Sequence, residues 1–277
     1  MAVISVIMGV YNQKNAEQLR QAVDSVLRQT MGDLEFLICD DGSDEEGAAI
    51  LREVCGKDAR IRLIQETKDL GDKGSRGKNR GLAWALNRCV EEARGEYIAR
   101  MDADDICEPG RFERQYEYLS HHPEVGYVGC GAELFDDHGT WGRREMPPEP
   151  TAEDYLRYSP FIHPSVMFRA EVLRKAGGYR TARETLRCED YDLFLRLYLS
   201  GCYGYNLPDV LFRYREDRNS YRKRTFPSRI REMMVRNRYF GRLPVSGCKR
   251  LFYTVRPLAA ALVPGGVIRL VRRTVQG

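Results

Sequence analysis

The sequence predicts an α/β fold in which a mostly parallel sheet is flanked by helices. Short apolar runs rich in β-branched residues alternate with segments whose apolar residues recur at helical spacing. This alternation favours parallel pairing, because each connecting helix returns the chain to the start of the next strand. The 277 residues are 43% hydrophobic and 30% charged, a balance typical of a globular chain that buries a core.

The first half of the chain contains four expected strands separated by three expected helices. Each strand is a nearly continuous apolar run, as expected when helices cover both faces of the sheet. The first helix is indicated by an apolar stripe from Leu19 to Leu27, and the next two by apolar residues around Ile50 and Leu86. The strands are expected at residues 3–10, 34–39, 61–64 and 97–99.

The second half is less regular. A helix is expected over residues 112–120 and a strand over 125–131, followed by a loop over 139–150 in which three prolines act as breakers. The chain should return to the sheet at 161–168. A short helix then ends at Gly177-Gly178, and an apolar helix covers 191–199.

Polar clusters follow three of the expected strands. They are Tyr11-Asn12, Asp40-Asp41-Gly42-Ser43 and Asp102-Ala103-Asp104-Asp105. Ligands of parallel α/β sheets bind beyond the carboxyl ends of the strands, so these clusters should meet at one edge. No G-x-G-x-x-G sequence follows the first strand and no Walker A sequence is present, which argues against a nicotinamide or flavin enzyme and a P-loop protein.

The acidic loop formed by Asp102, Asp104 and Asp105 is the strongest candidate for a metal site. Carboxylates this close repel one another unless a cation or a hydrogen-bond network holds them. Carboxylate oxygens suit Mg²⁺ or Mn²⁺, and these ions also bind substrate phosphates. The alternative is an acidic helix start that is stabilised by the helix dipole.

Two further side chains lie where they could act chemically. Asp190 begins an apolar helix, where a carboxylate is either a plain N-cap or a general base on a rigid mount. His163 lies in an apolar run and is a core histidine, a third metal ligand or a phosphate contact.

Basic residues precede the helix around Leu86. Guanidinium groups and helix-start amides suit a diphosphate, which makes Arg76 and Asn79 candidates. Lys78 and Arg80 fit a solvated basic loop better.

The cysteines and the charge distribution bear on compartment and partners. None of the eight cysteines forms a C-x-x-C pair, which favours scattered reduced thiols in a cytoplasmic protein over a zinc site. No signal peptide or membrane-spanning run is expected. From Arg213 onward the chain has 17 Lys or Arg and 3 Asp or Glu, whereas the preceding part has 27 and 37. The net charge of +4 therefore combines an acidic body with a basic tail.

An ordered series of motifs runs over about residues 3–215. Each motif is modest alone, but their order and spacing are specific. In the first half they are Ser5-Val6-Ile7-Met8, Tyr11-Asn12, Ser25-Val26-Leu27-Arg28-Gln29-Thr30, Asp40-Asp41-Gly42-Ser43, residues 76–81, Gly95-Glu96-Tyr97-Ile98 and the acidic loop. In the second half they are His163-Pro164-Ser165-Val166-Met167-Phe168-Arg169, Gly177-Gly178-Tyr179 and Glu189-Asp190-Tyr191-Asp192-Leu193. Together they resemble family 2 glycosyltransferases.

The resemblance implies a GT-A fold and an inverting, metal-dependent transfer of a sugar from a nucleotide-sugar donor, with UDP favoured. It implies a catalytic domain at 1–215 and a basic helical extension at 216–277. Asp190 would be the base, and Asp102 and Asp104 the D-x-D residues that hold Mn²⁺ or Mg²⁺. The donor-binding residues would be Val10, Tyr11, Asn12, Asp41, Arg76, Asn79, Asp102 and Ala103.

The expected acceptor is a saccharide or a lipid-linked hydroxyl in surface polysaccharide or glycoconjugate synthesis. The basic tail would place the protein peripherally on an anionic membrane, on the inner face of the cell membrane. The alternative is a helical lid on the catalytic domain, and no nucleic-acid recognition motif is present. A catalytically silent binding protein of the same fold is a second hypothesis. A third, a nucleotidyltransferase, would need a glycine-rich basic loop after the first strand, and Gly9-Val10-Tyr11-Asn12 is not one.

Overall fold

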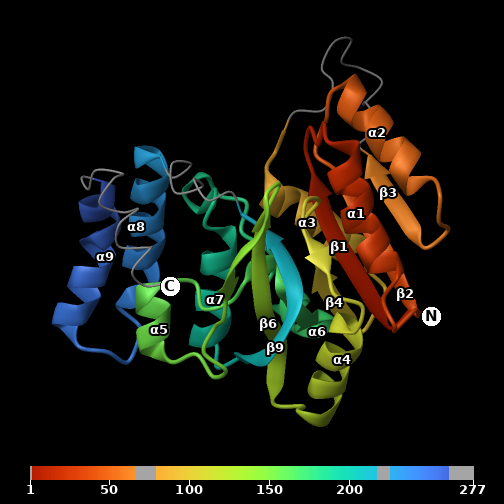
Figure 1. Ribbon diagram of the computed structural model, residues 1–277. Helices are drawn as coiled ribbons and strands as arrows, with labels where there is room; N and C mark the ends of the chain where they lie inside the picture. The colour runs from red at the N-terminus through yellow and green to blue at the C-terminus, as the bar shows by residue number, and fades with distance from the viewer. Residues whose placement is uncertain (1, 66–78, 217–224, 262–277) are drawn as a thin grey trace.

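The computed structural model describes residues 2–65, 79–216 and 225–261, and its strands form one mixed sheet (Figure 1). The strands pair in the order β3-β2-β1-β4-β8-β6-β9-β5, and β7 pairs with β6. Their bounds are β1 Ile4–Val10, β2 Leu34–Asp40, β3 Ile61–Gln65, β4 Tyr97–Arg100, β5 Ile106–Cys107, β6 Val125–Asp136, β7 Gly139–Arg144, β8 Met167–Arg169 and β9 Tyr203–Arg215. The prediction of an α/β fold with a helix-flanked sheet is confirmed.

Helices cover both faces of the sheet because successive strand side chains point to opposite faces. In β1, Val6 and Met8 pack in one core with α1, α2 and α4, whereas Ile7 packs in a second core with α3 and α7. The helices are α1 Ala16–Leu27, α2 Glu45–Cys55, α3 Leu82–Glu92, α4 Arg111–His121, α5 Ala152–Arg157, α6 Ala170–Lys175, α7 Glu189–Leu199, α8 Phe226–Phe240 and α9 Gly247–Ala261.

Parallel pairing brings the predicted polar clusters to one edge. Strands β3, β2, β1 and β4 are parallel neighbours, and Val10 at the end of β1 lies opposite Asp40 at the end of β2. Just beyond β4, the backbone N–H of Met101 donates to the carbonyl of Ile7 at 3.0 Å. The acidic loop therefore begins beside the end of β1, as the sequence pattern predicted.

Three parts of the second half differ from the sequence predictions. The expected loop over 139–150 is wrong for its first part, because β7 forms a hairpin with β6 and Gly139, at φ 109°, makes the turn. The expected return to the sheet at 161–168 begins with a short 3-10 turn, His163–Ser165, and only β8 pairs. Strand β9 was not predicted, and it pairs in parallel with β6 over most of its length.

The two C-terminal helices pack on the side of α7 away from β1 (Figure 1). Val235, Tyr239 and Phe240 of α8 are buried in the same core as α3 and α7. The buried guanidinium of Arg236 donates to the carbonyls of Leu156 and Tyr253 and so ties α8 to α5 and α9. Within the described residues, no helix has the length and apolar character needed to cross a membrane. All eight cysteines are free, in line with the scattered thiols expected.

Candidate functional site

The acidic loop between β4 and β5 brings three carboxylates together. One oxygen from each of Asp102, Asp104 and Asp105 lies within 4.8 Å of the others, and Asp105 is the buried member. Burial, and then the negative charge of Asp102, raise the pKa of Asp104 to about 6. The same two causes hold the pKa of Asp105 well above its ordinary value. The three carboxylates thus repel one another, and a bound cation would reduce this repulsion.

Two arginines hold the acidic loop in place. The buried guanidinium of Arg100 contacts the carboxylate of Asp102 at 2.6 Å. The backbone N–H of Arg215, at the end of β9, donates to Oδ1 of Asp105 at 2.7 Å, and its Nε donates to the carbonyl of Asp104 at 3.1 Å. The unpredicted strand β9 therefore supports the predicted site. Sequence reasoning overlooked Arg100, although a charge at the end of the apolar run 97–99 was a visible signal.

The donor set of this loop fits Mg²⁺ or Mn²⁺. All three side chains offer carboxylate oxygens, which these hard cations prefer. Oδ2 of Asp105 is buried and makes no hydrogen bond within the described part of the chain, so a polar atom is left for a ligand. The Arg100 guanidinium balances only part of the negative charge, because it contacts Asp102 alone among the three carboxylates.

His163 lies outside this carboxylate cluster. Its Nε2 pairs with the hydroxyl of Tyr179 at 2.9 Å, and its ring is buried against Phe194. Burial, and then the positive charge of Arg100, hold the pKa of His163 well below 6.5, so the imidazole is neutral. The structure therefore gives His163 the contacts of a core histidine, and its role as a third ligand stays a prediction.

A cavity of about 330 Å³ opens where the ends of β1 and β2 face the segment before α7. On one side it is lined by Val10, Tyr11, Asp41 and Asn79, four of the predicted donor-binding residues. The lining on the other side comes from the segment 180–189 and includes Glu189. Arg76 lies outside the described residues.

Asp41 and Asn12 shape the β1 and β2 side of the cavity. The two carboxylate oxygens of Asp41 accept the backbone N–H groups of Arg80 and Gly81, at 2.9 and 2.7 Å, and so anchor the start of α3. Asn12 takes a left-handed φ of 49°, and its side chain accepts the N–H of Asp44 at 2.8 Å. Asp41 lines the cavity, whereas Asn12 holds the segment that follows β1 against the start of α2. Ala103 lies close by, since its carbonyl accepts a long 3.5 Å bond from Gln13.

The start of α7 carries two adjacent carboxylates. The N-cap is Cys188, so Asp190 is the second residue of the helix and the plain N-cap reading is wrong. Arg187, just ahead, takes a left-handed φ of 66°, a strained conformation for a non-glycine residue. Burial, and then the charge of Asp190, raise the pKa of Glu189 to about 7.

A third carboxylate of α7, that of Asp192, holds the helix in place. Asp192 is fully buried and accepts the Nε of Arg196 and the hydroxyl of Tyr239 on α8, each at 2.8 Å. Arg180, which lines the cavity, approaches the same carboxylate at 3.5 Å. The sequence showed Asp192 only as part of a motif, because its partners are distant in the chain. This network holds the helix start that presents Asp190.

Charges of the acidic loop and of the start of α7 both act on Tyr179. Burial raises its pKa, the charge of Arg100 opposes that shift, and the charges of Asp190, Glu189 and Asp102 raise it further. The hydroxyl of Tyr179 therefore lies in the field of carboxylates from both parts of the chain. The side chain of Asn87 on α3 holds the backbone of Tyr179: its Nδ2 donates to the Tyr179 carbonyl at 2.7 Å, and its Oδ1 accepts the Tyr179 N–H at 2.8 Å.

Glu189 provides a pH test of this arrangement. Its folded-state pKa of about 7 exceeds the ordinary 4.5, so its contribution to stability is full below pH 4.5 and is lost as the pH rises through about 7. We expect the free energy of unfolding of the wild type, relative to Glu189→Gln, to fall by on the order of 2 kcal/mol between about pH 5 and pH 7.5. Urea titrations at a series of pH values measure it.

The matched control for this test is Glu53→Gln on α2. The pKa of Glu53 is lowered by its hydrogen bond to Arg20, so this variant should show no such fall. A difference between wild type and Glu189→Gln that is flat with pH would contradict the raised pKa.

Comparison with known proteins identifies relatives over most of the chain. The family model described as "Glycosyl transferase family 2" matches residues 5–177. The chain is 34% identical to the putative glycosyltransferase EpsE of Bacillus subtilis, over 96% of this chain and 91% of that protein. It is also 34% identical to the amylovoran biosynthesis glycosyltransferase AmsE of Erwinia amylovora, over 79% of each.

Solved structures share the fold. Staphylococcus aureus TarS in complex with UDP has a TM-score of 0.65 at 15% identity, covering 93% of this chain and 71% of that one. The mannosyltransferase PcManGT of Pyrobaculum calidifontis, in complex with GDP-Man and Mn²⁺, has a TM-score of 0.62 at 19% identity, covering 99% and 79%. At this identity the likeness concerns the fold.

Proposed function

The chain belongs to glycosyl transferase family 2, and on that basis we propose that it is an inverting, metal-dependent enzyme that moves a sugar from a UDP-sugar to a hydroxyl group. The acceptor is a saccharide or a lipid-linked saccharide in surface polysaccharide synthesis. The observation that carries the proposal is the cluster of Asp102, Asp104 and Asp105, which follows β4 beside β1 and has one carboxylate oxygen of each residue within 4.8 Å of the others. Transfer needs such a group at the donor and a base at the acceptor, and Asp190 at the start of α7 is the candidate base.

The donor is assigned to the edge formed by β1, β2 and β4. Val10, Tyr11, Asp41 and Asn79 line the cavity there, which suits a nucleobase and ribose. UDP is favoured by two relatives: the TarS structure holds UDP, and the Escherichia coli UDP-Gal:alpha-D-GlcNAc-diphosphoundecaprenol beta-1,3-galactosyltransferase is 28% identical over 79% of this chain. The latter name also supports a lipid-linked acceptor.

Asp102 and Asp104 would hold the divalent cation, with Asp105 behind them. When bound, the ion offsets the negative charge that develops on the leaving diphosphate. Arg100 fixes the carboxylate of Asp102, and Arg215 fixes the backbone of Asp104, so the oxygens are oriented before the donor arrives.

Asp190 accepts the proton of the acceptor hydroxyl as that oxygen attacks the anomeric carbon. A hydroxyl is a poor nucleophile, so a nearby base lowers the barrier. A single in-line displacement inverts the anomeric carbon and needs no covalent enzyme intermediate. The Asp192 network holds the start of α7, so the carboxylate is presented from a rigid helix.

A catalytically silent protein of the same fold is the alternative. The presence of Asp102, Asp104 and Asp190 favours an enzyme, since a silent protein would not need all three.

A donor-hydrolysis screen tests the proposed activity. The purified chain is incubated with UDP-, GDP- and TDP-sugars, each with Mn²⁺, Mg²⁺ or a chelator, and released nucleotide is measured. We expect release from a UDP-sugar that depends on the ion. No ion-dependent release from any donor, by a chain that binds none of the nucleotides in calorimetry, would refute the proposal.

A further inference from the structure

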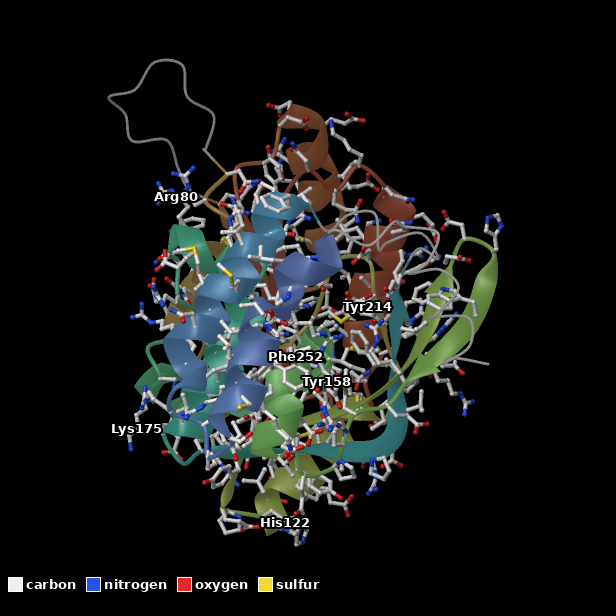
Figure 2. All side chains as sticks on the ribbon, turned by 90° about the vertical axis from the view of Figure 1, so that its left-hand side faces the viewer. Arg80, His122, Tyr158, Lys175, Tyr214 and Phe252 are labelled. Carbon is white, nitrogen blue, oxygen red and sulfur yellow. The ribbon has the colours of Figure 1, made fainter. Side chains whose placement is uncertain are left out.

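Helix α9 carries exposed apolar side chains on its outer face. Leu251 and Phe252 are 68% and 60% exposed, and Val255, one turn further on, is also exposed. Tyr158, at the end of α5, is 40% exposed and lies on the same face of the molecule as Phe252 (Figure 2). Helices α5 and α9 pack together, and Arg256 of α9 donates to the carbonyl of Arg157 at 3.2 Å. We call Leu251, Phe252, Val255 and Tyr158 the α9 face.

Positive charge surrounds the α9 face. Residues 225–261 contain eight Lys or Arg and a single acidic residue, Glu232. Glu232 pairs with the buried Arg236, so it does not offset the outer charges. Arg238, Arg242 and Arg256 are exposed, whereas the exposed Lys249 pairs with Glu153 of α5. An apolar stripe flanked by cations is the pattern of helices that lie in the interface of an anionic bilayer.

We propose that the α9 face docks the protein on an anionic lipid surface. Leu251 and Phe252 insert among the acyl chains, while the arginines contact the lipid headgroups. Charge decides between a bilayer and a second copy of the chain. Two copies meeting at this face would bring their basic rims together and repel, whereas an anionic surface attracts each of them.

The place of the α9 face relative to the cavity suits a membrane-bound acceptor. Helix α9 packs on α8, which in turn contacts α7 and the 3-10 turn Arg183–Thr185, whose Thr185 lines the cavity. Tyr239 of α8 bonds Asp192, two residues from Asp190. Docking would thus place the bilayer on the side of the protein that carries Asp190. The link to a membrane-bound acceptor rests on the function proposed above, whereas docking itself does not.

Vesicle co-sedimentation tests the docking. The full chain is mixed with phosphatidylcholine vesicles, with or without about one third phosphatidylglycerol, and bound protein is measured. We expect binding to the anionic vesicles alone, and partition at least about tenfold weaker for the double variant L251S/F252S. Both side chains are exposed, so circular dichroism should show an unchanged fold.

A charge variant with a matched control completes the test. R242S/R256S removes two cations beside the α9 face, and R28S/R52S removes two exposed cations from α1 and α2, on the far side of the sheet (Figure 1). The first pair should weaken partition several-fold and the second should not. Equal loss in both pairs, unchanged partition of L251S/F252S, or no binding of the wild type would overturn the proposal. So would dimerisation in sedimentation velocity that L251S/F252S abolishes. None of these readouts requires sugar transfer, so a failure of the proposed enzyme activity would be seen separately.

Discussion

Asp190→Asn is expected to slow sugar transfer by about 10²- to 10⁴-fold, the usual contribution of a positioned general base. Asparagine has the size and shape of aspartate but cannot accept the proton of the attacking hydroxyl at neutral pH. Asp190 does not itself line the cavity that holds the proposed donor-binding residues, so UDP affinity should change by less than about twofold. Single-turnover transfer with the best donor from the screen measures the first effect, and calorimetry measures the second.

Comparison with the neighbouring carboxylate of Glu189 shows which of the two residues is the base. Glu189 lines the cavity and has a pKa of about 7, which would also suit a base. If Glu189 were the base, Glu189→Gln would lose transfer while Asp190→Asn kept it. Asp24→Asn, the same isosteric change at an exposed carboxylate on α1, is the control for nonspecific effects. Unchanged turnover by Asp190→Asn would reject its role.

The sequence predicted the half of the fold in which local pattern and burial agree. Strands β1 and β2 are continuous apolar runs, and parallel topology then places the polar residues that follow them at one edge. Strand β9 was not predicted because Asn206, Pro208 and Asp209 interrupt its apolar pattern. These interruptions are tolerated in the structure: Asn206 bonds the carbonyls of Pro147 and Pro160, and the pairing with β6 shifts register near Gly131.

In the candidate site, too, the sequence predicted some residues and not others. The acidic loop and the helix that starts at Glu189 were visible as short motifs, whereas the residues that hold them were not. Arg215 reaches Asp105 across 110 positions of the chain, and Tyr239 reaches Asp192 across 47. Such partners depend on tertiary packing, which one sequence without relatives does not reveal. The same applies to His163, whose partner Tyr179 is set by the packing around Phe194.

Asp104→Asn is expected to remove most of the effect of Mn²⁺ on UDP binding. In the wild type, Mn²⁺ should strengthen UDP binding at least about tenfold, because the ion joins the carboxylates of the acidic loop to the diphosphate. The amide is neutral and a weaker ligand, and it also relieves the repulsion that raises the pKa of Asp104. Calorimetry with UDP, with Mn²⁺ and with chelator, gives both affinities for each protein.

Stability without the ion distinguishes a metal site from a merely structural cluster. If the three carboxylates exist to hold a cation, Asp104→Asn should keep or raise the thermal midpoint of the ion-free protein, because one repelling charge is gone. Mn²⁺ should then raise the midpoint of the wild type but not of the variant, since only binding to the folded state stabilises it. Asp137→Asn, at an exposed carboxylate that pairs with Arg215 beside the loop, should respond to Mn²⁺ like the wild type. Equal UDP affinity of the wild type with and without Mn²⁺ would count against the metal site, because the clustered charges would then need no cation for donor binding.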